Sequence, residues 1–247
     1  MNRLGENHRL VGDLDHATGP FVFCCEHAGK ALVGGVTPTA SDRLLLDDHW
    51  GSDIGAGTVT ESLARQTESV GILGLVSRLW VDLNRVETSE TLIVESCGGI
   101  PVSFNRNLDQ QQRQERITRH HTPYHHVLGE LILNRRTLGP TRLVSIHSFT
   151  PVWEGVPREM EIGVLFADDT PAMHAVADAL RMEGFVTALN APYSGQSGNL
   201  IYSAMLHGGR AQIPYLELEI RQDLIRTTKS AEEVATRIAR ALSVFRP

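Results

Sequence analysis

Two histidines stand just behind short apolar runs, and their side chains are of the type that binds metals. His27 comes after the run 21–25, and His147 follows the run 143–146. An imidazole at the end of a buried strand can bind a divalent cation through one nitrogen while an acceptor holds its other nitrogen. A catalytic zinc takes three protein ligands and keeps one position for water. The two histidines therefore predict a metal centre that needs one further ligand.

The third ligand has four candidates in one short stretch of sequence. Asp47, Asp48, His49 and Asp53 lie just ahead of the next expected helix or in its first turn. Each carries an imidazole nitrogen or a carboxylate oxygen, and zinc accepts both. We take His49 as the third ligand and Asp53 as its close rival.

A candidate general base lies in the stretch 215–221, where polar and apolar residues alternate strictly. In a strand, this alternation places Glu217, Glu219 and Arg221 on one face. A carboxylate beside a bound metal can take a proton from the attacking water and pass it to the leaving nitrogen of an amide. One glutamate is therefore expected to be the base, although the alternation does not choose between them. An edge strand with one solvated face is the other interpretation.

Other polar residues could hold a carboxylate of the substrate. Asn84 and Arg85 follow the apolar run 79–83. A guanidinium fork binds a carboxylate through two parallel hydrogen bonds, and an adjacent amide adds a donor. Further candidates for the substrate carboxylate or the scissile carbonyl are Ser148, Arg106, Arg210 and Arg221. With a metal centre, these residues predict hydrolysis of an amide in a small carboxylate-bearing molecule.

These side chains need a scaffold that brings strand ends together, and the sequence predicts one. Short apolar, β-branched runs alternate with helical patterns, which is typical of an α/β fold with a mixed, mostly parallel central sheet flanked by helices. Ligands of such sheets bind outside the carboxyl ends of the strands. The expected strands are residues 21–25, 71–76, 79–83, 143–146, 162–166, 185–188 and 214–220. The expected helices are residues 51–67, 108–138, 171–183 and 231–245, the last capped by Ser230.

The composition indicates one soluble domain that acts on a small molecule. The 247 residues are 41% hydrophobic and 21% charged, with a net charge of −6 and a pI near 6.0. We expect a single domain over 1–247, with 1–19 as an N-terminal extension. Without a basic cluster, neither a nucleic acid nor a membrane surface is an expected partner. The expected partner is a small carboxylate substrate, and the oligomeric state stays open.

The three cysteines, at positions 24, 25 and 97, are too few for a disulfide framework or a cysteine zinc site. Residues 1–20 are polar and lack a secretory signal, and no apolar run approaches the roughly 20 residues that span a bilayer. We therefore expect a cytoplasmic protein. Cys25 could serve as a thiol nucleophile near His27, although a cysteine in a strand is more often a small buried apolar residue.

Several motifs together resemble the N-formylglutamate amidohydrolase family, whose fold is related to that of zinc carboxypeptidases and aspartoacylase. The resemblance spans nearly the whole chain, and its motifs follow the order of the family. The similar segments are residues 25–28, 49–56, 81–85, 123–125, 145–151, 190–193 and 217–225.

The resemblance implies a carboxypeptidase-like fold and a divalent metal, with zinc as the expected ion, held by His27, His147 and a third side chain. Glu219 is similar to the glutamate base of that fold, and the pair 84–85 resembles the one that grips the substrate carboxylate. Carboxypeptidase-like enzymes have a glutamate three residues after the first histidine. Here that position is Lys30, so the third ligand must differ.

N-formyl-L-glutamate, cleaved to formate and glutamate, is the leading substrate that the resemblance implies. One alternative is a metallo-carboxypeptidase or a deacylase for a larger acyl or peptide substrate. Another is a relative that binds its ligand without catalysis.

Overall fold

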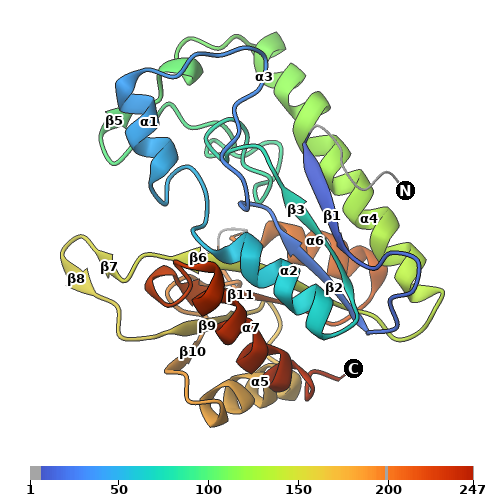
Figure 1. The fold of residues 1–247 in the computed structure, drawn as a ribbon. Helices are drawn as coiled ribbons and strands as arrows, with labels where there is room; N and C mark the ends of the chain where they lie inside the picture. Colours follow the sequence, from blue (N-terminus) through green and yellow to red (C-terminus); the bar gives the residue numbers. More distant parts are fainter. Residues whose placement is uncertain (1–6, 198–199, 247) are drawn as a thin grey trace.

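A seven-stranded sheet runs through the computed structural model, which describes residues 7–197 and 200–246 (Figure 1). Its strands are β1 (His8–Gly12), β2 (Phe21–Cys25), β3 (Val70–Gly74), β6 (Arg142–Phe149), β9 (Ile162–Leu165), β10 (Thr187–Leu189) and β11 (Tyr215–Arg221), in the order β1-β3-β2-β6-β11-β9-β10. Four of the six strand pairs are parallel, and the pairs β1–β3 and β11–β9 are antiparallel. The expected α/β class with a mixed, mostly parallel sheet is confirmed.

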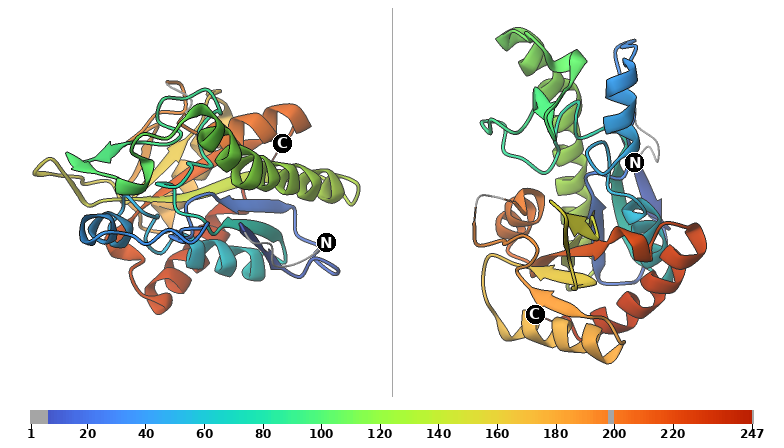
Figure 2. Two further views of the ribbon diagram at one scale, coloured as in Figure 1. Left: turned by 90° about the horizontal axis from the view of Figure 1, so that it is seen from above. Right: turned by 90° about the vertical axis from the view of Figure 1, so that its left-hand side faces the viewer.

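Helices cover both faces of the sheet (Figure 2). One face carries α2 (Ala56–Gln66), α5 (Pro171–Met182) and α7 (Thr228–Leu242), and the other carries α4 (Thr122–Arg136) and α6 (Tyr202–Ala211). Because side chains alternate along a strand, the residues of each strand pack into the cores on both faces of the sheet. In β11, Leu216, Leu218 and Ile220 pack under α2, α5 and α7. The two glutamates between them face the opposite side, as the alternation predicts.

Beyond the upper end of the sheet in Figure 1 lies a small group of elements that is not part of it. The group contains α1 (Ala40–Asp47), the hairpin of β4 (Ser96–Cys97) and β5 (Ile100–Pro101), a 3-10 turn (Ser103–Asn105) and α3 (Gln110–Arg116). Leu45, Leu79 and Val102 form its own apolar core. A π-helical turn, Ile117–His121, joins α3 to α4. A second hairpin, β7 (Val152–Trp153) and β8 (Val156–Pro157), projects from the body, and a 3-10 turn (Gln222–Leu224) follows β11.

Four expectations about the elements are corrected. Residues 79–83 are not a strand: they are buried and apolar but lie in a turn, where the Trp80 N–H donates to the Ser77 carbonyl at 2.8 Å. Residues 1–6 of the expected extension are outside the described part, and residues 8–12 pair with β3 as an edge strand of the sheet. Helices α1 and α6 were not expected. Helix α7 is capped by Thr227 and not by Ser230, which is the third residue of the helix and completes the capping box.

Helix α6 escapes prediction because it contains two glycines, which weaken a helical pattern. The packing explains one of them. A Cβ at Gly208 would lie 2.2 Å from the ring of Tyr215 on β11. The glycine therefore lets α6 lie close to the sheet, beside the strand that carries the two glutamates.

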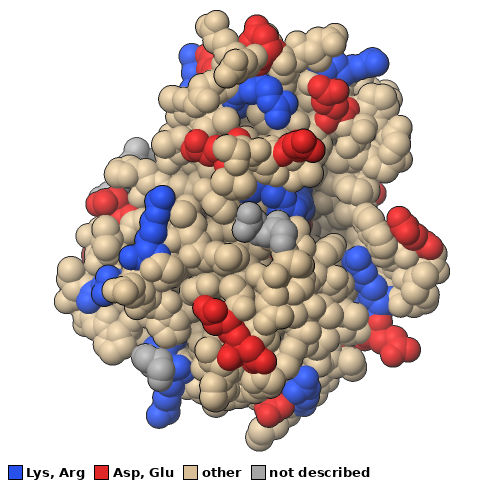
Figure 3. Space-filling model, turned by 180° about the vertical axis from the view of Figure 1, so that it is seen from behind, with Lys and Arg blue, Asp and Glu red and all other residues tan. Residues whose placement is uncertain are grey.

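The outer surface of the described residues shows no concentration of one charge sign on the face drawn in Figure 3, where basic and acidic side chains are interspersed. Among the helices formed by residues 7–197 and 200–246, none combines the length and apolar character needed to cross a bilayer.

Two buried histidines form a hydrogen-bonded pair between α4 and α6. His125 Nδ1 lies 3.0 Å from His207 Nε2, and His125 Nε2–H donates to the Leu83 carbonyl at 2.9 Å. A neutral His125 then accepts from His207 Nε2–H, and the pair is satisfied with both rings neutral. Burial lowers the pKa of His125 to about 3 and that of His207 to about 4.

We expect this pair to weaken the fold in acid. Below pH 6.5, the usual histidine pKa, the unfolded chain binds more protons than the folded one. The contribution is therefore complete above that pH, and the free energy of unfolding falls by about 1.4 kcal/mol per pH unit for each histidine as the pH drops toward the folded values. His207→Gln keeps a hydrogen-bond donor but does not titrate, so the free energy of unfolding of this variant should fall less steeply as the pH drops. Urea unfolding between pH 6 and 4 measures the difference, and equal slopes for both proteins would contradict the prediction.

Candidate active site

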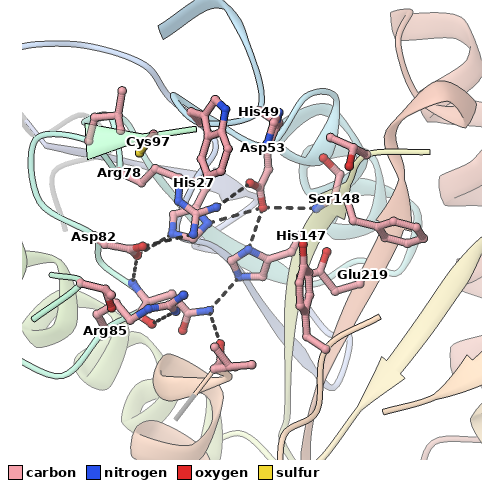
Figure 4. Close-up of a pocket in the computed structure, with 18 of the residues that line it drawn as sticks. His27, His49, Asp53, Arg78, Asp82, Arg85, Cys97, His147, Ser148 and Glu219 are labelled. Atoms are coloured by element: carbon pink, nitrogen blue, oxygen red, sulfur yellow. Dashed lines mark hydrogen bonds and ion pairs between the residues drawn. The ribbon is translucent and has the colours of Figure 1, made fainter. Parts of the chain in front are cut away.

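Residues from the strand ends and from the group of elements above them meet around one cavity of about 250 Å³ (Figure 4). It lies past the carboxyl ends of β2, β6 and β11, where the fold class places ligand sites. From the sheet it receives His147, Glu217 and Glu219, and from the turns around it His27, Asp53, Arg78, Asp82, Asn84 and Arg85.

Three side chains in the cavity form a compact group that could hold a metal ion. His27, Asp53 and His147 are buried, and one ligand atom from each lies within 4.8 Å of the others. Asp53 Oδ2 is 2.8 Å from His147 Nδ1 and 3.5 Å from His27 Nδ1. The shared atoms are therefore the two Nδ1 nitrogens and one carboxylate oxygen, a donor set that suits a divalent cation such as zinc.

The other nitrogens of the two imidazoles are held by carboxylates, which is how metal-binding histidines are oriented. His27 Nε2–H donates to Asp82 Oδ1 at 2.6 Å, and His147 Nε2–H donates to Glu26 Oε2 at 3.0 Å. His27 Nδ1 is buried and has no hydrogen-bond partner. A buried nitrogen without a partner, aimed at two other ligand atoms, fits a metal site.

The structure brings Asp53 to the two histidines and leaves His49 apart. The ring of His49 packs against Trp50, with centroids 4.4 Å apart, and His49 Nδ1–H donates to Asp48 at 3.0 Å. Asp47 forms an ion pair with Lys30 on the surface. Among the described residues, the compact group of possible ligand atoms contains the rival Asp53 and not His49, so the geometry favours Asp53 as the third ligand.

Burial and neighbouring charges set the protonation of the group. Burial disfavours the charged form of His147, but Glu217, Asp53 and Glu26 outweigh it and raise the His147 pKa well above its ordinary value. Burial also opposes ionisation of Asp53, yet the two histidines lower its pKa. These shifts favour a positively charged His147 beside a negatively charged Asp53 in a buried site.

The two glutamates of β11 differ in their contacts. Glu217 Oε2 accepts a hydrogen bond from Asn84 Nδ2 at 3.2 Å and lies 3.5 Å from His147 Nε2. Glu219 stands beside His147 in the strand register, and its Oε2 is buried without a partner. Burial raises the Glu219 pKa well above its ordinary value, and Asp53 and Glu217 add to the shift. Of the two glutamates, Glu219 is therefore the one with a buried carboxylate oxygen that no described group holds.

The polar residues expected to hold the substrate divide into two groups. Arg85 and Ser148 line the cavity together with Asn84. The Ser148 N–H donates to Asp53 Oδ2 at 3.2 Å, and its hydroxyl donates to the Ile54 carbonyl, so this residue also positions Asp53.

The remaining arginine candidates lie outside the cavity. Arg106 and Arg210 are exposed. Arg221 donates to the carbonyls of residues 158–160 and to Asp223, so it fixes the chain after β11. None of these three arginines is among the residues that line the cavity.

Among the residues of the cavity wall that sequence reasoning missed is an ion pair of Arg78 and Asp82. Arg78 Nη2 lies 3.2 Å from Asp82 Oδ2 and its Nη1 lies 3.4 Å from Asp53 Oδ1. Its side chain is 27% exposed, so the guanidinium borders the cavity as a charged donor. Asp82 could have been noticed as a polar residue within an apolar run, whereas no pattern in the sequence marks Arg78.

Cys25 is a poor candidate for a nucleophile. Its side chain is fully buried in the core under α2, and burial raises its thiol pKa. A reactive cysteine needs an accessible thiolate. The residue therefore acts as a small apolar side chain.

A carboxylate beside side chains that could hold a metal ion is an arrangement that suits a hydrolase. The profile of the N-formylglutamate amidohydrolase family matches residues 19–226, so the chain belongs to this family. It is accordingly an enzyme that hydrolyses amide bonds. Among curated proteins, none matches the chain.

Two solved structures are similar over nearly the whole chain. A gene product from Agrobacterium tumefaciens has a TM-score of 0.86 and 26% identity, over 97% of this chain and 96% of that chain. An N-formylglutamate amidohydrolase from Ralstonia eutropha has a TM-score of 0.75 and 18% identity, over 97% of this chain and 96% of that chain. The second match supports the fold.

Proposed function

We propose that the chain hydrolyses the amide bond of a small N-acyl amino acid in a metal-dependent reaction, with N-formyl-L-glutamate as the leading substrate and zinc as the metal. The observation that carries this proposal is the unpartnered Glu219 oxygen in the same cavity as the group His27, Asp53 and His147. The family to which the chain belongs supports the reaction class.

The size of the cavity favours a small substrate. Its volume of about 250 Å³ is below the roughly 300–1,000 Å³ of sites for drug-sized ligands. One N-acyl amino acid fits such a space better than an extended peptide does. This favours the proposed substrate class over the carboxypeptidase alternative.

The residues around the cavity have distinct roles in the proposed reaction. A cation held by His27, Asp53 and His147 would supply a more acidic water and polarise the acyl oxygen. Glu219 takes the proton of the attacking water and delivers it to the leaving nitrogen. Arg78 can donate hydrogen bonds to the negative charge that develops on the acyl oxygen.

Arg85 and Asn84 hold the substrate carboxylate in this proposal. Arg85 borders the cavity and is braced by its own Nη1–H, which donates to the Asn84 carbonyl at 2.8 Å. A fixed guanidinium orients the scissile bond, which makes the attack effectively unimolecular.

We expect Arg85→Lys to impair substrates with a free carboxylate far more than an uncharged N-formyl amide. Lysine keeps the charge but loses the fork, and breaking a buried charged contact costs about 2–5 kcal/mol. The measurement is kcat/KM for N-formyl and N-acetyl amino acids and for an N-formyl amide, with added zinc, manganese or cobalt, by detection of the released amine.

The same panel tests the function itself. Equal losses on charged and uncharged substrates would mean that Arg85 does not bind the carboxylate. No turnover of any compound with any metal, combined with retained ligand binding, would favour the non-catalytic alternative.

A further inference from the structure

One wall of the cavity is aromatic, and none of its residues takes part in the proposed hydrolysis. Trp50 and Trp153 contact each other and the ring of His49, and all three line the cavity. Their ring centroids are 5.8 Å apart for the two tryptophans and 5.9 Å apart for His49 and Trp153. We call these three residues the aromatic wall.

A single guanidinium extends this surface to two more rings. The Cζ of Arg158 lies 5.3 Å from the Trp153 ring centroid, 5.5 Å from that of Phe149 and 5.6 Å from that of Tyr193. Both additional rings line the cavity. Arg158 Nη1–H also donates to the Thr150 carbonyl at 3.3 Å. Cation–π contacts and this hydrogen bond hold the rings in fixed relation to one another.

The location of Trp153 points to a ligand. It sits on the projecting β7–β8 hairpin and keeps 37% of its surface exposed, next to the exposed Val152 and Val156. Exposed apolar groups that are clustered mark binding surfaces more often than chance. The side chain of a glutamate substrate would place a charged carboxylate against this aromatic surface, and the contact would add little binding free energy.

We propose that the aromatic wall is a subsite that binds an aromatic ring carried by the substrate. The inference deepens the proposed amide hydrolysis and rests on it. Two rings that already meet at an angle offer a third ring the edge-to-face and offset contacts that aromatic pairs prefer. The ring can belong to the amino acid side chain or to the acyl group, since both present the same chemistry to the wall.

The test compares three substrates of the metal-loaded enzyme: N-formyl-L-glutamate, N-formyl-L-phenylalanine and N-benzoyl-L-glutamate. The second carries the ring on the amino acid and the third on the acyl group. We expect kcat/KM for one ring-bearing compound to exceed that for N-formyl-L-glutamate by about tenfold, the upper range for an aromatic pair. Trp153→Ala should remove this preference, mainly through KM, and Trp153→Phe should keep most of it.

A variant on the same hairpin provides the matched control. Glu154 is exposed on the same hairpin and is not among the residues that line the cavity, so Glu154→Gln should leave all three rates unchanged. If neither ring-bearing compound is preferred, or if Trp153→Ala lowers all three rates equally, the wall is structural and the inference is overturned.

A binding measurement separates this inference from the proposed function. Isothermal titration of the Glu219→Gln protein with the same compounds needs no turnover. Tighter binding of a ring-bearing compound that is lost on adding Trp153→Ala supports the subsite even when wild-type enzyme hydrolyses none of them. Hydrolysis of N-formyl-L-glutamate with equal binding of all three compounds supports the proposed function and overturns the subsite.

Discussion

Glu219→Gln should abolish turnover and leave the metal content unchanged. The amide keeps the size of the side chain but cannot accept the proton of the attacking water, and general base catalysis typically contributes about 10²–10⁴-fold. The metal-binding atoms of His27, Asp53 and His147 are untouched by the change. Steady-state hydrolysis and elemental analysis of the purified variant are the two measurements.

Glu217→Gln is the matched comparison, because it makes the same change two residues away on the same face of β11. Its Oε2 already accepts a hydrogen bond from Asn84, so the change should cost orientation of Asn84 rather than the proton transfer itself. A larger remaining rate is therefore expected. If Glu217→Gln is inactive while Glu219→Gln turns over normally, the base is Glu217.

Asp53→Asn should remove both the metal and the activity. Substituting only the residue that orients a metal ligand weakens binding by about 10–100-fold, and loss of a charged ligand is expected to cost more. Metal affinity is measured by competition with a chromophoric chelator, and the rate is measured with excess metal.

His49→Ala is the control for this prediction, since His49 is the histidine that sequence spacing favours as ligand. Its ring packs against Trp50 and it is not part of the group of possible ligand atoms within 4.8 Å of one another, so the variant should retain its metal. If His49→Ala loses its metal as Asp53→Asn does, the proposal of Asp53 as the third ligand is contradicted.

The sequence pointed to much of the candidate site, because the carboxyl ends of neighbouring parallel strands converge at one edge of a sheet. β2, β6 and β11 are neighbours in the sheet, so His27, His147 and the two glutamates fall side by side. Period-two alternation correctly placed Glu217 and Glu219 on one face. The alternation is a local signal of the sequence, whereas the strand order that brings these residues together comes from the structure.

The proximity of Asp53 to the two histidines could not be predicted from local pattern. The Asp53 N–H donates to the His27 carbonyl at 2.9 Å, a contact between segments that are separate in the sequence. This bond places the Asp53 side chain next to His27. At the following turn, a Cβ on Gly55 would lie 2.1 Å from the Ile225 carbonyl oxygen, so the approach to α2 is shaped by tertiary packing.

The run 79–83 shows why a buried apolar segment is not always a strand. Its residues are buried, but a run of this length cannot be distinguished from a packed turn by periodicity. The turn still delivers Asp82 and Asn84 to the cavity. Arg221 illustrates the opposite error, because it follows the alternation of β11 yet turns toward the carbonyls of residues 158–160.

The three side chains that could hold a metal ion come from separate segments, which has a consequence for folding. Asp53 and His147 are 94 residues apart in sequence, and His27 comes from the end of a third segment. An ion bound to all three would act as a removable cross-link between distant parts of the chain. Binding to the folded state alone would raise the free energy of unfolding by about 2.7 kcal/mol when free metal is 100 times its dissociation constant. The melting temperature would then report metal occupancy directly, and catalytic competence and resistance to unfolding would rise and fall together.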